Sequence, residues 1–148
     1  MRVLADQENF RRRIERERED AVRFAATQLI KDLLQTADNL ARALESAPHD
    51  LGAQDEAMRN LLTGVAASER ALQETFKRHG ISRIQPTLGE PFDPNSHQAM
   101  FEVQGTEWPA GVIAQVVLPG YAHHGRLVRP AFVGVAKGGV EGKPDRPS

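Results

Sequence analysis

The sequence contains no cysteine, and its first 47 residues contain neither proline nor glycine. Without cysteine there can be no disulfide framework, no thiolate zinc site and no thiol nucleophile, which suits the cytoplasmic location that we expect. Basic and acidic residues nearly cancel, at 19 against 20, unlike the excess positive charge typical of nucleic-acid-binding proteins. The apolar runs are too short to span a bilayer, and the charged N-terminus lacks the apolar region of a signal peptide. We therefore expect neither a nucleic-acid partner nor a membrane partner.

The positions of the helix-breaking residues divide the chain. All nine prolines and all twelve glycines lie after residue 47. The residues before them are rich in Arg, Glu, Ala and Leu, which favour helix. This pattern predicts one helix from about Arg2 to Ser46, roughly 65 Å long. A helix of that length needs a packing partner.

A dense run of charge lies in the first half of this predicted helix. Nine of the ten residues from Arg11 to Asp20 are charged. The arginines at its start, Arg11 to Arg13, are either a docking or nucleic-acid-binding patch or a solvated helix face. Acidic residues recur four positions away from basic ones, and such pairs stabilise a helix by ~0.2–0.5 kcal/mol each without burying it. We therefore favour the solvated face.

Two apolar seams, spaced alternately four and three residues apart, indicate a helical hairpin. The first seam is Ala26, Ile30, Leu33, Ala37, Leu40 and Leu44, and the second is Met58, Leu62, Val65, Glu69, Leu72 and Phe76. A loop over residues 46–54 joins them, and the second helix is predicted from Gln54 to His79, with Gly80 as its left-handed C-terminal residue. One hairpin cannot bury its apolar face well, whereas two form a four-helix bundle. We therefore predict a homodimer with a core of Ile30, Leu33, Leu40, Leu44, Leu62, Val65, Leu72 and Phe76.

After Gly80 the hydrophobic period becomes two, which is typical of strands. Strands are predicted at Ile81–Ile84, around Ala99–Val103, at Val112–Leu118 and at Leu127–Val135. The fold class is therefore α+β: a long helix and helical hairpin forming a dimeric stem, followed by a small all-β domain. The predicted divisions are 1–80 for the stem, 81–137 for the β domain and 138–148 for a disordered tail.

Motifs for catalysis or cofactor binding are scarce. The sequence has no phosphate-binding loop, no dinucleotide-binding turn and no serine in a nucleophile-elbow context. Asp93 and His97 lie four residues apart, so an acid–base or metal pair is conceivable. Asp93-Pro94-Asn95 is also typical of a turn in which the side chains bond the local backbone, and we favour that interpretation. We expect no enzyme activity, no cofactor and no metal.

Two blocks of the β region resemble the signature of the GrpE family, the nucleotide exchange factors of DnaK-type chaperones. They are Pro91-Phe92-Asp93-Pro94-Asn95-Ser96-His97-Gln98-Ala99-Met100 and, after Gly120-Tyr121, Arg126-Leu127-Val128-Arg129-Pro130-Ala131-Phe132-Val133-Gly134-Val135. The stem segments Glu8–Arg13 and Asp38–Leu44 are similar to the long-helix motifs of the same family. The resemblance implies an elongated homodimer. It also implies that one β domain, or wing, binds the chaperone's ATPase domain and opens its cleft, so that ADP leaves.

The resemblance also implies which residues touch the chaperone. On the wing these are Phe92, Val117, Arg126 and Val135, and on the stem Arg11, Phe24 and Glu45. Val117 and Val135 can equally be core residues of the wing, and Phe24 can be a core residue of a coiled coil. An alternative function remains open, a coiled-coil scaffold whose β domain recognises another protein partner. Release of a labelled ADP from the chaperone separates the two functions.

Overall fold

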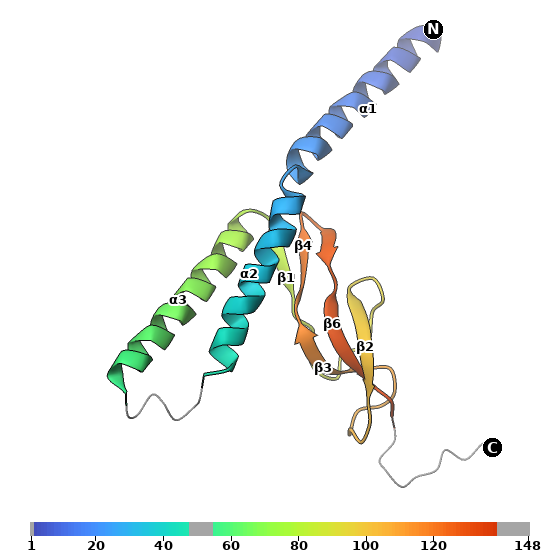
Figure 1. The fold of residues 1–148 in the computed structure, drawn as a ribbon. Coiled ribbons are helices and arrows are strands. Elements are labelled where there is room, and N and C mark those ends of the chain that lie inside the picture. The colour runs from blue at the N-terminus through green and yellow to red at the C-terminus, as the bar shows by residue number, and fades with distance from the viewer. Residues whose placement is uncertain (1, 48–54, 139–148) are drawn as a thin grey trace, which may run out of the picture.

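The computed structural model describes residues 2–47 and 55–138, in which three helices precede six strands. The elements are α1 (Arg2–Phe24), α2 (Thr27–Glu45), α3 (Glu56–Arg78), β1 (Ile81–Ile84), β2 (His97–Val103), β3 (Ile113–Leu118), β4 (Gly120–His123), β5 (Arg126–Arg129) and β6 (Ala131–Ala136). The predicted α+β fold class is confirmed. Figure 1 shows α2 and α3 as a hairpin beside the strands, with α1 extending away from both. Most of the predicted 46–54 loop, and the predicted disordered tail beyond residue 138, lie outside the described residues.

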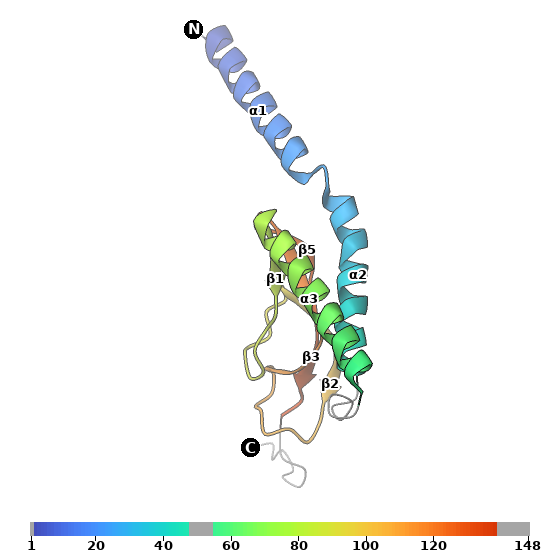
Figure 2. The same ribbon diagram turned by 90° about the vertical axis from the view of Figure 1, so that its left-hand side faces the viewer.

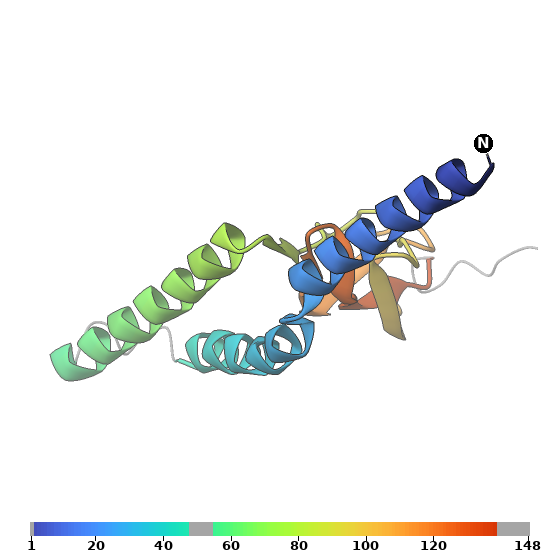
Figure 3. The ribbon, with the colours of Figure 1, turned by 90° about the horizontal axis from the view of Figure 1, so that it is seen from above.

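The prediction of one uninterrupted helix over residues 2–46 is wrong, because the chain turns at Ala25 and Ala26. Neither residue is a helix breaker, and no side chain caps the start of α2. The turn follows Phe24, whose ring lies 5.5 Å from the ring of His123 in the β domain. Packing of this junction against the strands therefore overrides the helical propensity of the sequence. Figures 2 and 3 show the resulting change of direction between α1 and α2.

The ends of α3 follow local rules. The Asp55 carboxylate accepts hydrogen bonds from the N–H groups of Ala57 (3.1 Å) and Met58 (3.3 Å), so it caps the helix. The predicted first residue, Gln54, lies outside the described residues. At the other end Gly80 adopts the predicted left-handed conformation, with φ of +78°. A Cβ at this glycine would also stand 2.3 Å from Cε1 of His124, so the His124 ring would have to move aside to accept a side chain here.

The strands form two three-stranded sheets, in the orders β1-β4-β5 and β2-β6-β3. In the second sheet β2 runs parallel to β6, whereas β3 runs antiparallel to it. The single strand predicted over Leu127–Val135 is wrong, because Pro130 separates β5 in one sheet from β6 in the other. Proline has no N–H for a strand ladder, so the chain changes sheets there. Strand β4 was not among the predicted strands.

Two apolar clusters hold the fold together. The first joins Ile30, Leu34 and Ala37 of α2 with Phe76 of α3, Ile81 of β1 and Tyr121 of β4. The second lies inside the β domain and contains Ile113, Ala131 and Val133. Because the first cluster includes residues on both sides of position 80, the hairpin and the β domain share a core. The division at residue 80 remains a prediction about chain organisation.

The eight residues predicted for a dimer core differ in how far the chain itself buries them. Ile30 and Phe76 are buried in the first cluster, and Leu72 packs against it. Leu40, Leu44, Leu62 and Val65 are half-buried. Leu33 is 37% exposed, and its neighbour Leu29 is 61% exposed. The assignment of these residues to a dimer interface remains a prediction.

Candidate functional site

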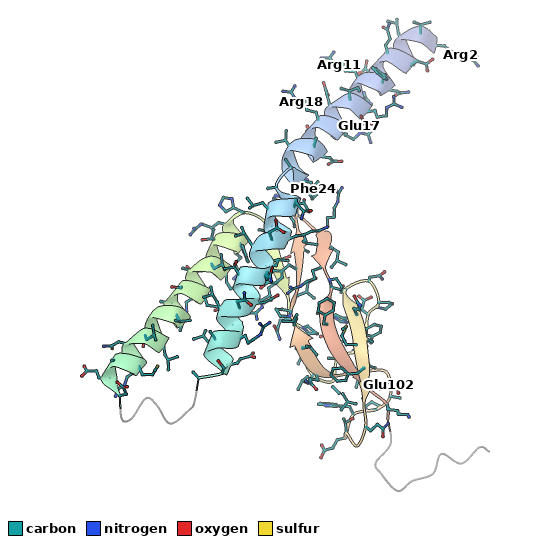
Figure 4. The ribbon with its side chains drawn as sticks, viewed as in Figure 1. Arg2, Arg11, Glu17, Arg18, Phe24 and Glu102 are labelled. Carbon is teal, nitrogen blue, oxygen red and sulfur yellow. The ribbon has the colours of Figure 1, made fainter. Side chains whose placement is uncertain are left out.

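Phe24 and Arg126, two of the residues implied as chaperone contacts, lie together at the junction of α1 with the β domain. The guanidinium carbon of Arg126 stands 3.7 Å from the centre of the Phe24 ring, in a cation–π arrangement. Figure 4 shows Phe24 at the bend between the first two helices. The side chains come from α1 and β5, so this contact joins the stem to the wing. The exposed Arg126 keeps its positive charge at the surface.

Two histidines pack beneath this contact. The rings of His123 and His124 lie 4.4 Å apart, and the Phe24 ring meets His123 edge to face. Burial lowers the pKa of His123 below its ordinary value of 6.5, and the positive charges of His124 and Arg23 lower it further. A hydrogen bond with the backbone of His79 acts in the opposite direction on this pKa. His123 therefore favours its neutral form beside several cationic groups.

Glu45 and Val117 form a second pair of implied contacts that the fold brings together. They line one groove of about 140 Å³ between α2 and the end of β3. Val117 is 46% exposed, so much of its side chain is free to contact a partner. The same groove is lined by Asp38 and Arg42 of α2. A single exposed apolar side chain is ordinary on a protein surface, so its position in the groove, and not its exposure, is what makes Val117 a candidate contact.

A buried ion pair lies between these two groups and was not predicted from the sequence. The two terminal guanidinium nitrogens of Arg129 on β5, Nη1 and Nη2, donate to the carboxylate of Asp38 on α2, Nη2 at 3.0 Å. The same Arg129 also donates to the carbonyl oxygen of Pro119. The Arg129 side chain is 18% exposed and that of Asp38 is 9% exposed. The pair therefore links the stem to the wing in a largely shielded position at the edge of the groove.

Phe92 and Val135 are placed differently from the other implied wing contacts. Both pack against the second apolar cluster, beside Ile113 and Val133. The Phe92 ring also lies 6.0 Å from the ring of His97. Their half-buried side chains contribute to the wing's core. A role as chaperone contacts remains a prediction for both.

Arg11 is far from the other implied contacts, along the projecting part of α1 (Figure 4). Its guanidinium lies 3.4 Å from the carboxylate of Glu15, and both side chains are exposed. Arg12 and Arg13 pair in the same way with Glu8 and Glu17. Exposed pairs of this kind contribute little to stability, and they match the solvated face favoured from the sequence.

Asp93 and His97 form the turn that the sequence favours. The Asp93 carboxylate accepts a hydrogen bond from the N–H of Asn95 at 2.9 Å, and Nδ1 of His97 accepts one from the N–H of Asp93 at 3.0 Å. His97 is buried. Both side chains therefore bond the local backbone. Over residues 2–47 and 55–138, no group of three or more His, Cys, Asp or Glu side chains could hold a metal ion.

The ion pair between Asp38 and Arg129 was not predicted, because the two residues lie 91 positions apart in the sequence. A signal existed, since Asp38 follows Ile30 and Leu34 at intervals of four, on the apolar face of the helix. An acid in such a stripe indicates a buried partner of opposite charge. Arg129 likewise ends the short strand run Arg126–Arg129 just before Pro130. Sequence spacing alone does not pair the two.

The chain thus has an α+β fold whose helices and strands share a core. The candidate contact residues lie on both the helices and the strands. The chain belongs to the GrpE family, whose model matches residues 1–137. It is 49% identical over 140 residues to Protein GrpE of Methylobacterium nodulans, covering 94% of this chain and 62% of that protein. It is 44% identical over 145 residues to Protein GrpE of Brucella anthropi, covering 98% of this chain and 63% of that protein. The chain therefore spans somewhat less than two thirds of the length of these relatives. Within the described residues no helix is long and apolar enough to cross a membrane.

Proposed function

We propose that this chain is a nucleotide exchange factor, a co-chaperone that binds the ATPase domain of a DnaK-type chaperone and promotes release of ADP. The observation that carries the proposal is membership of the GrpE family over residues 1–137. The proposed activity belongs to protein folding and the response to heat stress, in the cytoplasm. It requires no cofactor and no bond-breaking step by this chain.

The arrangement of the candidate contacts supports this proposal. Phe24 and Arg126 form one group at the α1 junction, and Glu45 and Val117 form another beside the far end of α2. Arg126 can pair with a carboxylate of the chaperone, and Val117 offers apolar area. Two contact groups on one folded chain can hold two parts of a partner at a set separation.

Exchange would follow from differential binding. If both groups fit the open form of the ATPase domain better than the closed form, binding shifts the population towards the open form. ADP favours the closed form in this scheme. Linkage then requires that ADP weaken the binding of this chain by the same factor by which this chain weakens the binding of ADP. The chain need not touch the nucleotide.

We further propose that the chain acts as a homodimer through its stem, residues 1–80, with the wing at residues 81–137. An apolar groove of about 470 Å³ lies where the start of α2 and the end of α3 meet the β domain. Its lining includes Leu29, Leu33, Leu72 and Phe76 of the hairpin, and also His123 and His124. The predicted seams repeat every three and four residues along both helices of this hairpin. A second copy offers the same seams and can cover the exposed leucines.

The exchange assay uses a DnaK-type chaperone loaded with a fluorescent ADP analogue and chased with excess ATP. We expect release to accelerate and to saturate as this chain is added. Release at the spontaneous rate would refute the proposal. Binding to the chaperone without acceleration would favour the alternative, a scaffold protein with a recognition domain.

Variants locate the contact surface. Replacing Arg126 by Ala should raise the concentration needed for half-maximal acceleration by about tenfold, because a central charged anchor is lost. The matched control is Arg13→Ala, which removes an arginine from a similar pair: its guanidinium lies 5.2 Å from the Phe10 ring on α1. An equal effect of both variants would show that loss of positive charge, rather than loss of this contact, governs binding.

A further inference from the structure

The ion pair between Asp38 and Arg129 has a directional geometry that the apolar contacts around it lack. Arg129 donates to both carboxylate oxygens of Asp38 and to the Pro119 carbonyl oxygen, so its planar group is held by two elements at once. Two-pronged pairs of this kind fix orientation as well as distance. Both side chains are mostly shielded, at 18% exposed for Arg129 and 9% for Asp38, which reduces competition from water for these bonds.

The neighbouring contacts hold the wing against the stem without fixing its rotation in the same way. The shared cluster around Leu34 and Tyr121 is apolar, and apolar burial is not directional. A second polar contact joins α3 to β4, where Nε2 of Gln73 donates to the Tyr121 hydroxyl at 3.0 Å. This bond and the contacts of Phe24 with His123 and Arg126 restrain the wing at the ends of α3 and α1. The Arg129 bonds add a two-pronged attachment on α2, farther along the stem.

The position of the pair connects it to the candidate contact surface. Arg129 shares β5 with Arg126, and Asp38 shares α2 with Glu45. Asp38 and Glu45 are seven residues apart, about 10 Å along the helix. Asp38 also lines the groove that contains Glu45 and Val117. A rotation of the wing about this point would therefore move Arg126 relative to Phe24, and Val117 relative to Glu45, and so change the shape of both contact groups.

We propose that the Asp38–Arg129 pair is a positioning device that sets the angle between wing and stem, and thereby how well the two contact groups fit the open chaperone together. The kinetic part of this inference rests on the proposed exchange activity, whereas the geometric part does not. Neither residue is required to touch the chaperone. Loss of the pair should reduce the preference for the open form more than it reduces binding itself.

The test compares Asp38→Asn with Asp32→Asn. The control removes the same charge from an exposed position on the same helix. Because the chain has no cysteine, spin labels can be attached to cysteines introduced at Gln35 on α2 and Glu102 on β2, both of which are exposed. Excess unlabelled chain restricts the measured distances to one chain. Figure 4 shows Glu102 on the wing, away from the stem.

We expect Asp38→Asn to broaden or shift the distance distribution, and Asp32→Asn to leave it unchanged. In the exchange assay, Asp38→Asn should lower the plateau rate by roughly 2- to 30-fold, the range found for residues that carry coupling between sites. The half-saturating concentration should change by a smaller factor. If the pair only stabilised the fold, its loss would reduce the amount of folded chain. The half-saturating concentration would then rise while the plateau rate stayed the same.

The inference would be overturned if Asp38→Asn gave the same distance distribution and the same plateau rate of exchange as Asp32→Asn. If Asp38→Asn does not fold, Arg129→Lys decides by the same two measurements, because lysine keeps the charge and loses the two-pronged geometry. An unchanged distance distribution in that variant would also overturn it. Failure of the unmodified chain to accelerate ADP release would refute the proposed function, while the distance measurement would still test the geometry.

Discussion

Truncating the exposed leucines of α2 should weaken association between chains, whereas truncating a buried leucine beside them should destabilise the fold. Leu33 is 37% exposed and lines the apolar groove with Leu29, which is 61% exposed. Leu34 is 2% exposed and packs in the core shared by stem and wing. We predict that Leu29→Ala with Leu33→Ala dissociates the proposed dimer and leaves each chain folded. Leu34→Ala should instead destabilise the fold of each chain.

The magnitudes follow from the exposed fractions. Leu29 and Leu33 together leave roughly one whole leucine exposed, and burial of one leucine contributes about 1.5–3 kcal/mol. Two copies per dimer make this about 3–6 kcal/mol, so the double variant should raise the dissociation constant by about 10²- to 10⁴-fold. Leu34→Ala removes a buried side chain and should lower the free energy of unfolding by about 2–5 kcal/mol.

The two effects are separated by measuring mass by sedimentation equilibrium, and unfolding by urea, over a range of chain concentrations. The control is Leu88→Ala, which removes a leucine that is 50% exposed in the β domain and does not line the groove. It should leave the dissociation constant unchanged. A double variant that associates as tightly as the unmodified chain would refute the proposal that a second copy covers this groove.

Three further predictions concern the His123 cluster, the tight glycine of the wing and the exposed helix α1. Because burial, His124 and Arg23 lower the pKa of folded His123, the unfolded chain binds more protons in mildly acid solution. Urea titrations should therefore show His123's contribution to stability complete above about pH 6.5 and lost below it, by at most about 1.4 kcal/mol per pH unit. Gly120→Ala should cost about 3 kcal/mol or more, because the new Cβ would lie 2.5 Å from the Ala131 backbone nitrogen, which cannot move aside. On heating, α1 should unfold in calorimetry before the rest, because none of its residues is buried.

Each of these predictions has a control or a contradicting result. His123→Phe should remove the acid-dependent loss of stability, and an unchanged pH slope would assign that loss to other groups. Gly125→Ala should cost only about 1 kcal/mol, because this glycine has φ of +79° but no atom within 4 Å of the new Cβ. A single calorimetric transition that covers both helix and sheet would contradict early unfolding of α1.

Features set by local sequence were predicted well. The helical hairpin followed from the two seams, and the left-handed Gly80 followed from its place after a helix rich in terminal cations. The strands β1, β2 and β3 followed from alternating or β-branched residues between turn residues. In each of these cases the signal lies within the element itself, because burial on one face imposes a period on the sequence.

Features set by distant contacts were missed. The turn at Ala25 and Ala26 contains two good helix formers, and the contact of Phe24 with the wing is long-range. Strand β4 is only four residues long and begins at Gly120, whose backbone approaches that of Ala131. Its pairing with β1 and β5 supplies what local propensity lacks. The break between β5 and β6 was also missed, although Pro130 is a local signal, because proline lacks the N–H that a strand ladder needs.

The shared core bears directly on how such a chain could open a partner's cleft. A wing joined to its stem by a flexible linker could bind both lobes of the partner in either conformation, and binding would then not favour the open form. Here Leu34 of α2 and Tyr121 of β4 lie in one cluster, and Arg129 bonds Asp38 beside it. If the proposed contacts bind the chaperone, the binding free energy at Phe24 and Arg126 is tied to the position of Glu45 and Val117. A contact surface of fixed shape is what allows binding to distinguish one conformation from another.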